Sequence, residues 1–160
     1  MLKRLMKRAD EEQGFTLIEL MVVVLIIGIL IAIALPTFLG ARARAQDRAA
    51  QSDLRNTLVA AKTMYTDSSS YTAANDTATG LITVEPSLAY VAAGTASTVA
   101  VPSVSVSAAA TTWAAARMSA SGTCYWVKDV ATGPGTTYGS TAVAADCTGT
   151  DALVAADPAW

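Results

Sequence analysis

A long apolar run near the N-terminus constrains this chain more than any other feature of its sequence. From Phe15 to Ala41 the only ionisable side chain is Glu19, and residues 20–41 carry no charge. As a helix, these uncharged residues would extend about 33 Å, enough to cross the roughly 30 Å hydrocarbon core of a bilayer. Apolar side chains would lie on all sides of that helix, which does not fit a water-soluble amphipathic helix. We therefore expect a membrane-spanning segment.

A second helical pattern follows the apolar run. Apolar or small side chains recur there at spacings of three and four, as on one face of an amphipathic helix: Ala50, Leu54, Leu58, Ala61 and Tyr65. The sequence YTDSSSYTAANDTATG, rich in Ser, Thr and Ala, then ends the pattern. We predict one long helix, from about Phe15 to Tyr65, whose outer half packs on a globular head.

Charge is distributed unevenly along the 160 residues. The formal charge of the whole chain is −2, but residues 42–66 carry +3 and residues 67–160 carry −5. The chain has room for one domain, or for a small domain with an appendage. Because it contains no histidine, Ser-His-Asp and Cys-His catalysis and histidine metal sites are excluded. We expect neither an enzyme nor a cofactor.

Three stretches of the head have strand-like patterns. Residues 81–85 are apolar and β-branched and end at a proline; residues 98–107 alternate Val with small residues but change phase at Pro102. That change predicts a bulge or a break between two strands. Residues 123–130 give the strongest pattern, since they are aromatic and β-branched and precede the turn at residues 133–135. We expect an α+β fold with the long helix packed on a small antiparallel sheet.

The segment Gly14-Phe15-Thr16-Leu17-Ile18-Glu19 joins a charged leader to the apolar run. A charged glutamate at membrane depth costs roughly 2.5 kcal/mol or more unless it is paired, so such a residue is a functional candidate. Its natural partner is a positive charge at the same depth. Cleavage just before Phe15 would supply one, as a free amino group.

This segment closely resembles the signature of the type IV prepilin family, in which a cut after Gly is followed by F-T-L-I-E and a long hydrophobic helix. The resemblance implies that a membrane-embedded prepilin peptidase cuts after Gly14 and that the new N-terminal Phe15 is methylated. It implies that Glu19 pairs with the N-terminal amine of a neighbouring subunit during assembly. Gly28 and Pro36 match the family's helix-weakening positions, which fits the intrinsic helix-breaking chemistry of both residues.

The resemblance also implies a domain organisation and a function. The expected parts are a leader, a transmembrane and assembly helix, an amphipathic helix and a β-rich head, at residues 1–14, 15–41, 42–66 and 67–160. The chain would be a structural subunit of a pilus-like filament, spanning the cell membrane with a cytoplasmic N-terminus before assembly and forming an extracellular pilus afterwards. Its partners would be membrane lipid, the prepilin peptidase, the assembly platform with its ATPase motor, and further copies in a helical filament. In the head, residues 80–86 and 121–129 resemble pilin-like proteins of actinobacteria.

Other interpretations stay open. The same N-terminus serves major pseudopilins of type II secretion and minor or competence pilins that bind protein partners or DNA, and the arginines after the apolar run could contact nucleic acid. An ordinary signal peptide, cut at the small-x-small sites Ala41-Arg-Ala43 or Ala43-Arg-Ala45, would explain the apolar run. So would a plain single-pass anchor. Neither explains the residues from Gly14 to Glu19.

Cys124 and Cys147 are the two cysteines of the chain. In a domain outside the cell we expect a disulfide between them rather than two free thiols. We expect no metal site, because no histidine or further cysteine completes a tetrahedral set. Three acidic residues near the C-terminus fit solvated loops better than a calcium loop: Asp146, Asp151 and Asp157.

Overall fold

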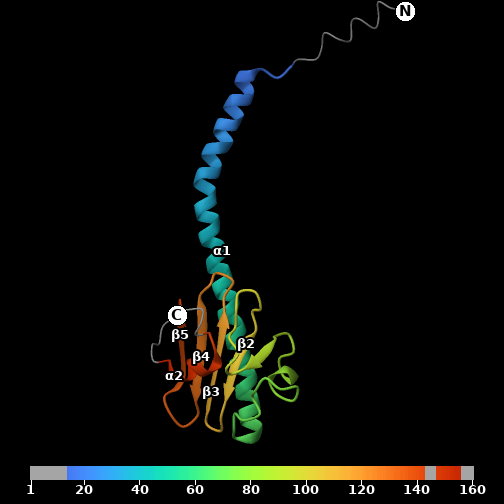
Figure 1. Cartoon of the computed structure of the whole chain (residues 1–160), viewed down its shortest axis with the longest axis vertical. Coiled ribbons are helices and arrows are strands. Elements are labelled where there is room, and N and C mark those ends of the chain that lie inside the picture. Colours follow the sequence, from blue (N-terminus) through green and yellow to red (C-terminus); the bar gives the residue numbers. More distant parts are fainter. Residues whose placement is uncertain (1–13, 143–146, 156–160) are drawn as a thin grey trace, which may run out of the picture. The chain divides into compact units, whose positions relative to one another are not determined.

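The computed structural model describes residues 14–142 and 147–155, and in that part of the chain one long helix accompanies a five-stranded sheet (Figure 1). The long helix α1 spans Leu17–Ser68. The strands are β1 Tyr90–Ala92, β2 Val104–Ala108, β3 Thr112–Met118, β4 Cys124–Val130 and β5 Gly135–Thr141. Two short helices are the 3-10 helix η3, Leu81–Thr83, and α2, Gly149–Val154. The expected α+β class is confirmed.

The chain divides into two compact units that meet between Ala41 and Arg42. In the first unit, α1 continues without a break from Leu17, and every side chain from residue 14 to residue 39 is exposed. The helix is long and apolar enough to cross a membrane, and none of its most apolar stretch is buried within the chain. The apolar run therefore forms the expected helix but makes no core of its own.

In the second unit, α1 packs on the sheet through the stripe that the sequence predicts. Leu54 and Ala61 are fully buried, Leu58 is almost so, and Tyr65 is partly buried against the same core. On the sheet side this core contains Trp113, Val127 and further strand residues. The prediction that the outer half of the helix packs on the head is confirmed.

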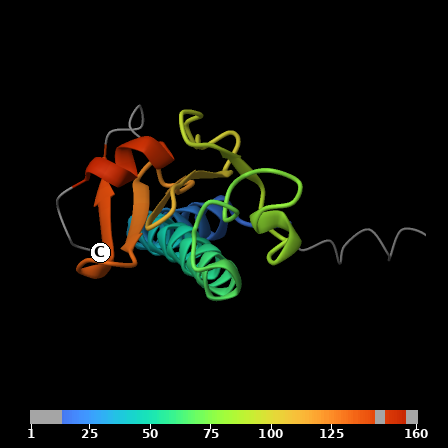
Figure 2. The same cartoon turned by 90° about the horizontal axis from the view of Figure 1, so that it is seen from below.

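The sheet is covered on both faces, because α2 packs opposite α1 (Figure 2). Along β3, Trp113 and Ala115 belong to the core under α1, while Ala114 and Ala116 belong to a second core under α2. Successive side chains of a strand point to opposite faces, so a strand between two helices is apolar throughout instead of alternating with polar residues. This explains the run of alanines in β3.

Strands β2 to β5 form an antiparallel meander in chain order, whereas β1 pairs with β2 in parallel. Tyr90 lies opposite Val104 in that parallel register. The sheet is thus mostly, not wholly, antiparallel. The strongest predicted strand, residues 123–130, is confirmed as β4, and the predicted turn at residues 133–135 leads into β5.

The expectation of a strand at residues 81–85 is wrong, because the chain forms the 3-10 helix Leu81–Thr83 there. Leu81 is fully buried, but Ile82 and Val84 are both more than two-fifths exposed. An extended segment needs a neighbouring strand to pair with its backbone N–H and C=O groups, and one buried side chain does not provide that strand. The backbone groups of this segment are paired instead by local hydrogen bonds of the 3-10 type.

The interpretation of residues 98–107 is wrong in its first half, since only the stretch from Val104 onward forms a strand, β2. Before it, the chain turns: the amide of Val101 donates to Thr98 Oγ1 at 3.0 Å, and Val99 and Val101 are exposed. Pro102 has no amide hydrogen to contribute to a ladder. The phase change therefore marks the beginning of one strand, not a junction of two.

The expected disulfide is confirmed. Cys124, at the start of β4, is bonded to Cys147, just before α2, with a Cα–Cα distance of 5.5 Å. Both residues are buried in the core under α2. The bond therefore holds the C-terminal segment against the sheet.

Candidate functional site

The N-terminus of α1 is capped by reciprocal hydrogen bonds between Thr16 and Glu19. The amide of Thr16 donates to Glu19 Oε2 at 2.9 Å, and the amide of Glu19 donates to Thr16 Oγ1 at 3.3 Å. The Thr16 hydroxyl also donates to Glu19 Oε2 at 2.6 Å. This is the geometry of a capping box, which satisfies amides that a helix N-terminus otherwise leaves unpaired. All bonds to the carboxylate involve one oxygen, and among the described residues Oε1 accepts none.

Gly14 and Phe15 lie just outside this cap. Both are exposed, and Phe15 is 78% accessible. A Cβ added at Gly14 would meet nothing within 4 Å, so the described part of the chain does not cover the peptide bond between the two residues. Chemically, this segment can present an accessible bond to a protease and a carboxylate one turn away.

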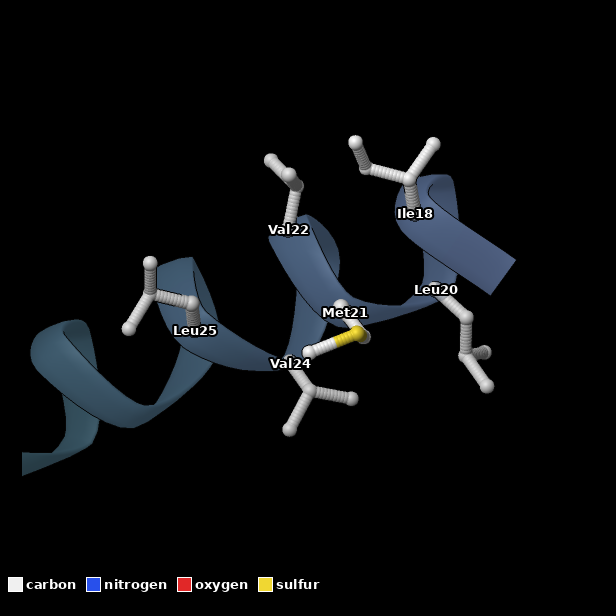
Figure 3. A pocket seen from close by; sticks show the side chains of 6 residues that line it. All are labelled: Ile18, Leu20, Met21, Val22, Val24 and Leu25. Carbon is white, nitrogen blue, oxygen red and sulfur yellow. The ribbon is translucent and has the colours of Figure 1, made fainter. Parts of the chain in front are cut away.

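A broad apolar surface follows on the same helix. Figure 3 shows six side chains from consecutive turns of α1 that spread over its sides: Ile18, Leu20, Met21, Val22, Val24 and Leu25. They point to different sides of the helix instead of converging on an enclosed cavity. The surface therefore suits lipid chains or other helices better than a small ligand.

Helix α1 passes through both Gly28 and Pro36 without interruption. A Cβ on Gly28 would touch nothing within 4 Å, so the single chain does not require glycine at that position. Pro36 cannot donate a backbone hydrogen bond, and next to it Thr37 Oγ1 donates to the Ala34 carbonyl at 2.9 Å. The weakening of the helix at these positions stays a prediction.

Asp129 anchors the far part of α1 to the sheet. This carboxylate is almost buried and accepts hydrogen bonds from Tyr71, Thr136 and Lys62, with Lys62 Nζ at 3.0 Å. Burial alone would raise the pKa of Asp129, but these three donors outweigh it and hold the pKa below its usual value. Burial and the bond to Asp129 raise the pKa of Tyr71.

Two further acids attach the nearer part of α1 to the head. Asp47 Oδ1 accepts hydrogen bonds from the hydroxyls of Ser119, at 2.8 Å, and Ser121. Asp53 pairs with Arg117 at 2.8 Å; burial raises the pKa of Asp53 although the arginine opposes it. These anchoring acids could not be predicted from the sequence, since nothing in their spacing identifies a partner far away in the chain.

Within the described residues, no three His, Cys, Asp or Glu side chains come together as a possible metal site. Asp151 lies in the first turn of α2, and Thr148 caps that helix: Thr148 Oγ1 accepts from the Asp151 amide at 3.0 Å and donates to the Asp151 carboxylate. Asp146 and Asp157 lie outside the described residues.

The N-terminal region of the chain is similar in sequence to known proteins. Residues 11–35 match the family described as the prokaryotic N-terminal methylation motif. The chain therefore carries this methylation motif at its N-terminus. It is 46% identical over 59 residues to the type IV major pilin protein PilA of Myxococcus xanthus strain DK1622, covering 37% of this chain and 27% of that protein. It is 41% identical over 49 residues to the type II secretion system core protein G of Escherichia coli strain K12, covering 31% of this chain and 34% of that protein.

The resemblance to the type IV prepilin family is therefore confirmed. The matches span about a third or less of these two relatives' lengths, and no solved structure matches the chain. Thr16, which caps the helix through Glu19, is a functional residue of this segment that was not predicted from the sequence. Its T-x-x-E spacing before an apolar run is a recognisable capping signal.

Proposed function

We propose that this chain is a structural subunit of a type IV pilus-like filament. The observation that carries the proposal is the exposed apolar half of α1, which begins directly at the prepilin motif. An apolar helix with no buried face is stable in lipid, or among other helices that cover it. Polymerisation through this helix would cover it with the same helices of neighbouring copies.

Processing would begin the sequence of events. A prepilin peptidase would cut between Gly14 and Phe15, removing the leader 1–14, and Phe15 would be methylated on its new amine. The exposure of both residues supports this step. Before assembly the subunit would be anchored in the cell membrane with its N-terminus in the cytoplasm; an assembly platform and its ATPase motor would then extract it into an extracellular filament.

Glu19 would set the register of assembly. In the single chain, Thr16 engages one carboxylate oxygen and leaves Oε1 for a neighbour's amine. An incoming subunit in the correct register neutralises this charge, whereas a misplaced one leaves it unpaired in an apolar bundle, at a large energetic cost. The helix-weakening role of Gly28 and Pro36 belongs to the same proposal.

Two observations bear on the alternatives. The small-x-small sites at Ala41-Arg-Ala43 and Ala43-Arg-Ala45 lie inside α1, where the backbone is helical and not extended as a protease binds it. The likeness to a type II secretion core protein makes a secretion pseudopilin the second candidate. Long surface filaments support the pilus; short ones that appear only with secretion machinery support the pseudopilin.

The test uses the full chain in its own cells. Intact mass of the mature protein should show loss of residues 1–14 and one added methyl group. Glu19→Ala should be cut and inserted in the membrane but should yield few filaments, while Glu19→Asp, which keeps the charge, should retain part of the yield. A mature N-terminus beyond Ala43, or normal filaments from Glu19→Ala, would contradict the proposal.

A further inference from the structure

The two ends of the head carry opposite charges that find no partner among residues 14–142 and 147–155. Where α1 enters the second unit, Arg42, Arg44 and Arg48 are exposed; we call residues 42–48 the collar end. Asp67, in the last turn of α1, and Asp76, in the loop beyond it, mark what we call the far end, residues 67–76. In the part of the chain that the structure describes, these five side chains form no ion pair and no hydrogen bond.

The ends are too far apart to neutralise each other. Arg44 and Asp67 are 23 residues apart on one continuous helix, which corresponds to about 34 Å. That distance is several times the roughly 8 Å over which physiological salt screens electrostatic interactions. The opposite charges can therefore meet only between molecules.

The sheet confirms that Asp76 lies at the far end. The indole nitrogen of Trp113, near the start of β3, donates to the carbonyl of Ala74 at 3.0 Å, and Tyr71 donates through its amide to Ala110 at 3.1 Å. The other end of β3 leads into the hairpin that bonds to Asp47 at the collar end. The loop that carries Asp76 is thus held at the opposite end of the sheet from the collar.

The charges between the two ends are mostly engaged inside the head. Arg117 pairs with Asp53, Lys62 with Asp129, and Lys128 donates to two backbone carbonyls at 3.1 Å. Asp47 also lies at the collar end, so the formal charge of residues 42–48 is +2. The head therefore has a basic end and an acidic end, and the charges that lie between the two ends are mostly paired with each other.

We propose that the collar end of one copy docks against the far end of a second copy, with Arg44 and Arg48 facing Asp67 and Asp76. This inference rests on the filament proposed above. Copies that point in one direction and are displaced along the helix axis bring such ends together, and the contact repeats without closing. Arg44 and Arg48 are four residues apart and share one face of α1. Complementary charge of this kind selects register and orientation more than it adds affinity.

The test is a charge swap in the full chain, expressed in its own cells without the native copy. Arg44→Glu with Arg48→Glu should lower the filament yield about tenfold or more, as should Asp67→Lys with Asp76→Lys, because each exposed pair contributes up to about fivefold. Combining the four substitutions should restore the yield to within about twofold of wild type. Arg44→Lys with Arg48→Lys keeps the charge and serves as the matched control. Equal chain levels and an intact Cys124–Cys147 bond show that each variant folds.

Failure to restore assembly in the fourfold variant would overturn the pairing. If, in addition, the Arg44→Glu, Arg48→Glu chain no longer bound vesicles of phosphatidylglycerol and phosphatidylcholine while the Asp67→Lys, Asp76→Lys chain did, the collar end would serve lipid headgroups instead. A wild-type chain that forms no filament would refute the proposed function and this contact with it. Wild-type filaments together with an unrecovered fourfold variant would refute the contact alone.

Discussion

Helix α1 meets two different surroundings along its length. In its first half, up to Ala41, large apolar side chains such as Leu25 remain more than half exposed, whereas in its second half Leu54 is fully buried under the sheet. Both halves satisfy their backbone hydrogen bonds locally, as any α-helix does. Only the second half finds, within the same chain, a surface that removes its side chains from water. The first half is thus a hydrogen-bonded helix that lacks tertiary packing within the described part of the chain.

This contrast has a direct energetic consequence. Substitutions in the second half should change the stability of the single chain, and those in the first half should change its interactions with lipid or with other copies. Measurements on each half separately therefore test this difference.

The largest difference is expected for deletion of the same side chain in each half. Leu54→Ala should lower the free energy of unfolding of the head by about 3 to 5 kcal/mol, because it leaves a cavity in the core. Leu30→Ala, on the exposed half, should change it by less than about 0.5 kcal/mol. Urea unfolding of the full chain in detergent micelles, followed by tryptophan fluorescence, measures both. Equal effects would abolish the distinction between the halves.

Reduction of the disulfide should act on the head alone. The bond between Cys124 and Cys147, 23 residues apart, stabilises by about 3 kcal/mol in the chain-entropy model. Reductant should therefore lower the melting temperature of the head by about 10 °C or more, without changing the helicity of the apolar half. A chain with both cysteines changed to serine should melt at the reduced value and no longer respond to reductant.

Acid should weaken the attachment of α1 to the sheet through Asp129. Its pKa in the folded chain is lowered, so its stabilising effect is present above the unfolded value of about 4 and is lost as the pH falls below it. Asp129→Asn should cost about 2 kcal/mol at neutral pH, since it weakens hydrogen bonds to a charged group. In this variant the free energy of unfolding should also fall less steeply as the pH is lowered. Unfolding measured between pH 2 and 7 tests this, with the exposed Asp67→Asn as the control.

The smallest effect is expected at the N-terminal cap. Thr16→Val removes the hydroxyl that bonds to Glu19 and should destabilise the first turn of α1 by about 1 kcal/mol, while Thr16→Ser keeps the hydroxyl. Amide hydrogen exchange of residues 17–20 in micelles should accelerate for Thr16→Val only. The melting temperature of the head should not move; a shift there would mean that the cap is coupled to the second unit.

Much of α1 and of its motif could be predicted from the sequence. The uncharged run, the stripe containing Leu54 and Leu58 and the segment Gly14 to Glu19 are all local patterns, because helix periodicity and capping depend on neighbours within a few residues. The roles of Gly14, Phe15, Glu19, Gly28 and Pro36 in processing and assembly stay predictions, since they concern other molecules.

The sheet could be predicted only in part. β4 was recognisable by its aromatic and β-branched residues, but β3, whose centre is Ala114 to Ala116, has a composition that does not favour strands. It is a strand because it pairs with β2 on one side and β4 on the other, and the small side chains of Ala114 to Ala116 are buried between the sheet and the two helices that cover it. The opposite error occurred at residues 81–85, where β-branched residues lacked a partner strand.

Local sequence patterns were enough to predict a long helix with an apolar half and an amphipathic half, a prepilin-like motif at its start, and two cysteines with a reason to pair. The tertiary structure was needed to show which segments become strands, that β1 joins the sheet in parallel, and which acids anchor the helix. It was also needed to show that basic and acidic groups with no ion pair among the described residues lie at opposite ends of the head. Helical hydrogen bonds and the length of an apolar run depend on residues close together in the sequence. Strand pairing, burial of both faces of a sheet and ion pairs depend instead on residues far apart in the chain.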